Sequence, residues 1–160
     1  MPKSIIFWVI GIGALFMVGF TAKKIWGTTL GLRSNNPGNI RAISGVKWQG
    51  QTGANEKGFV IFDTAENGIR ALSKVLKNYY TKHGLTDVKG IINRWAPPVE
   101  NDTNSYVNSV AAKLKVSPTS KLILNVATFK SLASAIILHE NGVNPYPDTL
   151  IKSSVEKGLA

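Results

Sequence analysis

One carboxyl group ends an apolar helical stripe near the C-terminus. Residues 126–140 carry apolar side chains at helical spacing, and Glu140 falls on the same face. A carboxyl group on a core-facing stripe is partly desolvated, so it keeps its proton more readily, as a general acid for glycosidic cleavage must. A second interpretation stays open, in which Glu140 caps a nearby loop or pairs with Arg41 or Arg70.

Other acidic and imidazole groups offer less chemistry. Glu66, Glu100 or Asp102 would supply the second carboxylate if the reaction needs two. Asp102 also suits the cap of a following helix. His83 and His139 have no ligand spacing around them and the chain has no cysteine, so we expect no metal. No nucleotide-binding or nucleophile-elbow motif is present, and we expect no cofactor.

The elements that must position Glu140 are mostly helices. Asp63 and Glu66 fit a capping box that opens the first of them. Residues 46–48 are expected to pair with residues 59–62 in a hairpin. The expected fold class of the folded domain is therefore mainly α with a small β-hairpin. The expected helices cover residues 63–83, 86–95, 102–114 and 126–140.

The N-terminal segment is long and apolar. Residues 4–22 carry no charge and would span roughly 28 Å as a helix, enough for the hydrocarbon core of a bilayer. The exit GFTAKK lacks the small residues of a cleavage site, so we expect a retained single-pass transmembrane helix rather than a cleaved signal. The chain is divided into an anchor (1–24), a linker (25–32), a folded domain (33–147) and a C-terminal tail (148–160).

The chain is strongly basic. Nineteen Lys and Arg residues against nine Asp and Glu give a formal net charge of +10. Such a charge predicts attraction to polyanions, which include nucleic acid, anionic lipid and the bacterial cell wall. No nucleic-acid recognition motif accompanies the charge, so we do not expect nucleic acid to be the partner.

Five segments resemble, in order, a family of phage virion proteins. Its members are described as structural proteins or as virion-associated peptidoglycan-degrading enzymes with a lysozyme-like fold. The likeness runs from Arg33 to Tyr146. It implies a lysozyme-like α+β domain carried by a phage. Together with the expected anchor at residues 4–22, it places the protein in the lipid membrane of a phage particle. The segments are RSNNPGNIR (33–41), KWQGQTG (47–53), GFVIFDTAENGIRAL (58–72), GIINRWAPPVENDTNSY (90–106) and AIILHENG (135–142).

A weaker likeness links the chain to N-acetylglucosaminidase and lytic transglycosylase domains. In those domains an Ala-rich helix ends in a catalytic Glu, and an Asn-Asn-x-x-x-Ile hairpin and a Phe-x-x-(Phe/Tyr)-Asp stretch follow it. NNPGNI and FVIFD resemble the second and third parts, whereas AIILHENG resembles the first but comes last. The resemblance implies a circularly permuted lysozyme-like domain with Glu140 as the general acid.

The expected function is cleavage of the MurNAc-GlcNAc glycan strand of peptidoglycan during genome entry, by a transglycosylase or a hydrolase. The alternative is a non-catalytic structural membrane protein that links the viral membrane to capsid or genome. Expected partners are peptidoglycan, lipid through residues 4–22 and other virion proteins. Six residues are expected to line the glycan cleft by hydrogen bonding and ring stacking, although turn and core roles also suit some of them: Asn35, Asn36, Trp48, Trp95, Tyr106 and Asn141.

Overall fold

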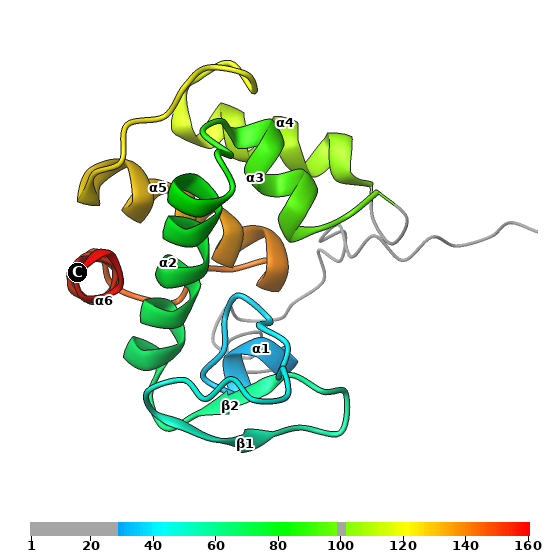
Figure 1. Ribbon diagram of the computed structural model, residues 1–160, viewed down its shortest axis with the longest axis vertical. Helices are drawn as coiled ribbons and strands as arrows, with labels where there is room; N and C mark the ends of the chain where they lie inside the picture. Colours follow the sequence, from blue (N-terminus) through cyan, green and yellow to red (C-terminus); the bar gives the residue numbers. More distant parts are fainter. Residues whose placement is uncertain (1–28, 99–101) are drawn as a thin grey trace, which may run out of the picture.

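Helices make up most of the part of the chain that the computed structural model describes, residues 29–98 and 102–160. One small antiparallel sheet accompanies them (Figure 1). The expectation of a mainly helical fold with a small β element is confirmed. The elements in chain order are α1 (Leu30–Arg33), β1 (Gln51–Ala54), β2 (Val60–Phe62), α2 (Ala65–Lys82), α3 (Val88–Trp95), α4 (Thr103–Leu114), α5 (Val126–Asn141) and α6 (Asp148–Leu159).

Helix α2 runs through the middle of the molecule and divides it into two ends. Figure 1 shows α3 and α4 gathered at one end, and the two strands with α1 at the other. Helix α6 packs along α2, and α5 packs against α2, α4 and α6. Their apolar faces form one core, in which Phe62, Leu72, Phe129 and Ile136 are fully buried or nearly so.

Most helix ends follow capping signals in the sequence. The side chain of Asp102 accepts a hydrogen bond from the backbone N–H of Ser105 and so caps α4. Gly142 ends α5 in the left-handed conformation that favours glycine. The expected cap at Asp63 was wrong by one residue, because Thr64 accepts the bond from the Asn67 N–H and opens α2.

The first strand lies further along the chain than the sequence predicted. Residues 46–48 form no strand, and Gln51–Ala54 pairs with Val60–Phe62 instead. The reason is a turn: the Gln51 N–H donates to the Trp48 carbonyl, and the Gln51 side chain accepts from the Trp48 N–H. Pairing starts only after Gly50, whose carbonyl accepts from the N–H of Asp63.

The expected fold class needs one correction, which concerns the transmembrane helix. Within residues 29–98 and 102–160, no helix is both long enough and apolar enough to cross a bilayer. The segment 4–22, where we expected that helix, lies outside the described residues. The fold class of the described residues is therefore mainly helical with a two-stranded sheet.

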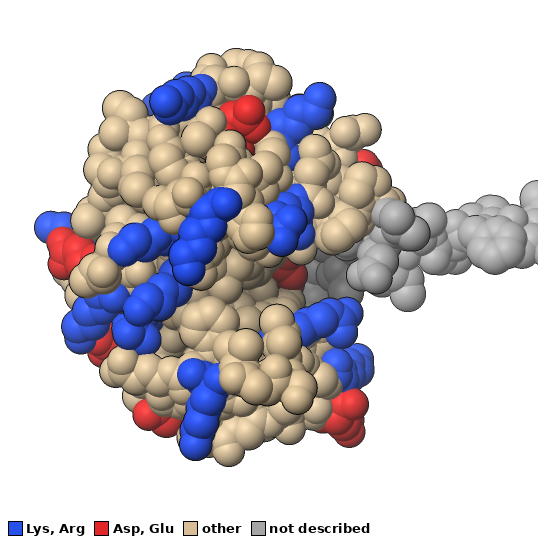
Figure 2. Space-filling view, viewed as in Figure 1, with Lys and Arg blue, Asp and Glu red and all other residues tan. Residues whose placement is uncertain are grey.

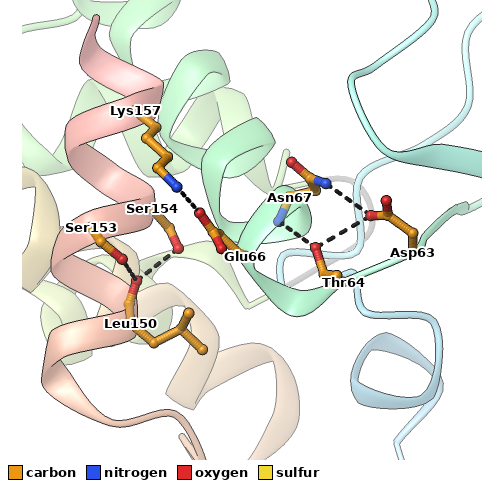
Figure 3. A network of polar contacts seen from close by, with 8 residues as sticks. All are labelled: Asp63, Thr64, Glu66, Asn67, Leu150, Ser153, Ser154 and Lys157. Carbon is orange, nitrogen blue, oxygen red and sulfur yellow. Dashed lines mark hydrogen bonds and ion pairs between the residues drawn. The ribbon is translucent and has the colours of Figure 1, made fainter.

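The C-terminal tail, residues 148–160, to which the sequence assigned no element, contains all of α6. Ile151 and Val155 are buried against the core, and Gly158 lets the helix approach α2 closely. A Cβ atom at Gly158 would lie 2.6 Å from the Cβ of Ser73. Figure 3 shows the same junction from its polar side, where Lys157 of α6 pairs with Glu66 of α2.

Candidate active site

The carboxyl group of Glu140 accepts hydrogen bonds from three side chains. Asn39 Nδ2 donates to Oε2 over 2.9 Å. Trp95 Nε1 and Tyr106 OH both donate to Oε1, each over 3.1 Å. The donors come from the loop after α1, the end of α3 and the first turn of α4, so three separate segments fix one carboxyl group at the end of α5.

This carboxyl group lines a cleft of about 390 Å³, a size suited to a small ligand or a sugar unit of a polymer. The cleft runs between the helical end and the hairpin end of the molecule. Figure 2 shows that face hollowed between the two ends. Aromatic and apolar side chains form most of its wall. The lining residues are Gly38, Asn39, Ile40, Arg41, Ile43, Trp48, Phe59, Val75, Tyr79, Trp95, Ala96, Pro97 and Glu140.

Asn39 reaches the carboxyl group because the loop that carries it is tightly held. Asn36 is fully buried, and its amide nitrogen donates to the carbonyls of Ile40 and Val60 over 2.9 Å each. Its side-chain oxygen accepts from the Ile40 N–H, also over 2.9 Å. The loop is thereby tied to β2, and Asn39 sits in it with a φ of 51°. Asn tolerates this left-handed conformation better than most residues do.

Two further asparagines bond to backbone rather than line the cleft. Asn35 donates to the carbonyls of Phe62 and Asp63. Asn141 donates to the carbonyl of Pro37 over 2.8 Å, and its side-chain oxygen accepts from the Thr29 hydroxyl. The expected substrate-binding role of Asn35, Asn36 and Asn141 stays a prediction, but their observed bonds hold the segment around Asn39.

Tyr106 is positioned to remain a hydrogen-bond donor. Its ring stacks on the imidazole of His139, with centroids 3.5 Å apart and planes 10° from parallel. Burial raises the pKa of Tyr106 far above its ordinary value, and the neighbouring Glu140 carboxylate raises it further. The phenol therefore keeps its proton at neutral pH and donates a hydrogen bond to Oε1.

His139 gives the domain a pH-dependent stability. Burial lowers the pKa of His139, and Glu140 opposes the shift. Because the unfolded chain then binds a proton more readily than the folded chain, the contribution of His139 to stability is full above about pH 6.5, its unfolded pKa, and is lost as the pH falls below it towards the lowered pKa of the folded chain. We expect the free energy of unfolding, measured by chemical denaturation, to fall more between about pH 7.5 and pH 5 in the wild type than in His139→Gln. The exposed His83 serves as the control, and a His83→Gln variant that removed the same pH dependence would contradict this assignment.

Neither of the two candidates for a second carboxylate that the structure describes, Glu66 and Asp102, lines the cleft with Glu140. Glu66 forms its ion pair with Lys157 at the junction of α2 and α6 (Figure 3). Asp102 caps α4, and Glu100 lies outside the described residues. Glu140 is thus the single carboxyl group among the described residues that line the cleft.

The cleft also contains residues that sequence reasoning did not select. Asn39 is the third asparagine of NNPGNI, and the motif alone does not tell it apart from Asn35 and Asn36. Tyr79 and Phe59 also line the cleft. Of the expected lining residues, the structure brings Trp48 and Trp95 to the cleft, whereas Tyr106 is buried and donates a hydrogen bond to Glu140.

Comparison with known proteins places the chain among phage proteins. No family model matches it. Protein P5 of Pseudoalteromonas phage PM2 is 44% identical to it over 132 residues, which cover 81% of this chain and 81% of that protein. The match supports the expected relation to phage virion proteins. The chain belongs to the family of Protein P5 of Pseudoalteromonas phage PM2.

Proposed function

We propose that the protein is carried in a phage particle and cleaves the glycan strand of peptidoglycan, with Glu140 as the general acid. The observation that carries this proposal is one carboxyl group, held by Asn39, Trp95 and Tyr106, in an aromatic-lined cleft. A carboxyl group in such a cleft can protonate the glycosidic oxygen, and aromatic walls suit the apolar faces of sugar rings.

The chemistry follows from having a single carboxyl group in the described cleft. Glu140 gives its proton to the glycosidic oxygen as the bond from that oxygen to the sugar C1 breaks, and the substrate's acetamido oxygen stabilises the positive charge on C1. The Glu140 carboxylate then takes a proton from the substrate's C6 hydroxyl, whose oxygen closes the 1,6-anhydro ring. If water attacks C1 instead, the water gives one of its own protons to the Glu140 carboxylate, and the product is a reducing sugar. Trp95 and Tyr106 donate to the oxygen that carries negative charge between the two proton transfers.

The neighbourhood of Glu140 supports a permuted order of the domain. Asn39 belongs to NNPGNI and Phe59 to FVIFD, and both line the cleft that Glu140 reaches from the far end of the chain. The three segments that resemble parts of lytic transglycosylase domains thus meet in space in spite of their order in the sequence.

A second candidate function is a non-catalytic structural role in the phage particle. The observation that favours it is the relationship to a phage virion protein. In that case the bonded cluster around Glu140 joins α5 to α3, α4 and the loop after α1 and serves only to hold the fold.

Digestion of purified peptidoglycan by the full chain separates the two functions. The soluble products are identified by mass spectrometry. Anhydro-muropeptides are the expected result and indicate a lytic transglycosylase, whereas fragments with reducing ends indicate a hydrolase. If a folded chain releases no fragments, the catalytic proposal fails and the structural role takes its place.

A further inference from the structure

We infer that the cleft continues into a groove for a carboxylate-bearing glycan, with Arg41 and Arg94 as anion-binding positions on either side of Glu140. This inference rests on the proposed function, which identifies the bound polymer as peptidoglycan. It adds that the carboxylates of that polymer are recognised by the two arginines.

Arg41 occupies the hairpin side of the cleft. Its guanidinium carbon lies 5.0 Å from the ring centre of Phe59, and both residues line the cleft that contains Glu140. An isolated β-bridge between Arg41 and Phe59 holds the two backbones side by side. The ring limits the freedom of an otherwise exposed side chain, so the guanidinium stays close to the opening of the cleft.

Arg94 repeats this arrangement on the helical side. Its guanidinium carbon lies 5.3 Å from the ring centre of Tyr79. Arg94 and Tyr79 line a second cavity, of about 600 Å³, together with Leu85, Gly90, Asn93 and Pro97. Tyr79 and Pro97 also line the first cleft. The two cavities therefore adjoin at Tyr79 and Pro97, and the inferred groove joins them there.

The charges along this groove select its ligand. Among the described residues that line the two cavities, Arg41, Arg94 and Glu140 are the ones that carry charge. A guanidinium presents several donors that match a carboxylate. Arg94 uses part of this capacity on Tyr79, to which it also makes a side-chain hydrogen bond. A glycan with carboxylates on successive units, such as the lactyl and peptide carboxylates of peptidoglycan, fits this pattern better than an uncharged sugar polymer.

Binding to charged and neutralised strands tests the inference. The full chain with Glu140→Gln is titrated with soluble peptidoglycan glycan strands that keep their carboxylates, and with the same strands after conversion of the carboxylates to amides. We expect the amidated strands, and the added pair Arg41→Gln and Arg94→Gln, each to weaken binding about tenfold. The matched pair Lys57→Gln and Lys89→Gln removes equal charge, from the turn between β1 and β2 and from helix α3, at residues that do not line the two cavities.

The outcomes separate this inference from the proposed function. Equal affinity for both kinds of strand, or an equal loss in the lysine pair, would overturn the groove even if the wild type digests peptidoglycan. Arginine-dependent binding by a chain whose wild type releases no fragments would support the groove and reject catalysis. Circular dichroism of each variant shows whether it folds, and the amidated strands test the inference without any arginine substitution.

Discussion

A chain carrying Glu140→Gln is expected to release glycan fragments about a thousandfold more slowly than the wild type. Glutamine has the shape of glutamate but no acidic proton, so it cannot protonate the leaving oxygen. Its carbonyl oxygen can still accept from Trp95 and Tyr106, and the Asn39 amide can rotate to accept from the new NH₂ group. The fold should therefore survive while the reaction stops, and the rate of fragment release measures the difference.

Glu66→Gln is the matched control for this experiment. It makes the same chemical change at an ion pair between α2 and α6, outside the cleft. We expect its rate of fragment release to stay within about twofold of the wild type, because a partly exposed ion pair contributes little to stability. Wild-type rates in a folded Glu140→Gln chain would show that Glu140 is not the acid.

Gly68→Ala is expected to lower the free energy of unfolding by about 3 kcal/mol or more. In an ordinary helix this substitution would stabilise by about 1 kcal/mol. At Gly68 in α2, however, the added Cβ would lie 1.9 Å from the carbonyl oxygen of Asn35. That oxygen belongs to the backbone of the loop that carries Asn39, so it cannot swing away as a side chain would. Chemical denaturation measures the loss.

Gly90→Ala provides the comparison within another helix. Its Cβ would meet the Asp87 side chain at 3.3 Å, a contact that a small side-chain movement relieves. We expect its free energy of unfolding to change by no more than about 1 kcal/mol. If Gly68→Ala unfolds at the same denaturant concentration as Gly90→Ala, the close approach of α2 to the loop is not essential.

The sequence was most informative where structure depends on neighbours along the chain. Asp102 and Gly142 carry local capping signals, and the helices they bound were placed within a few residues. The prediction of the first strand failed because the start of that strand depends on a hydrogen bond between Gly50 and Asp63. These residues are too far apart along the chain for a local sequence pattern to reveal the bond. Helix α6 was not predicted because its apolar residues are buried only through packing against α2, where Gly158 lies close to Ser73.

The candidate site shows the same division. The stripe on α5 identified Glu140 as a carboxyl group at the edge of the core, and the motifs drew attention to Trp95 and Tyr106. Sequence could not tell that both donate to one oxygen of Glu140, because this depends on how α3 and α4 dock. Nor could the sequence separate the roles of Asn36 and Asn39. The Asn36 amide donates to a carbonyl of β2 and the Asn39 amide to Glu140 of α5, and both contacts depend on the tertiary fold.

The large sequence separation between Glu140 and its hydrogen-bond partners also determines when the site forms during folding. Asn39 and Glu140 are 101 positions apart along the chain, and the bonds to Trp95 and Tyr106 close loops of 45 and 34 positions. Contacts of such range form late, because loop closure must be completed before they stabilise anything. A growing polypeptide therefore holds all three donors long before it holds their acceptor, and the arrangement is completed only when the end of α5 has been synthesised.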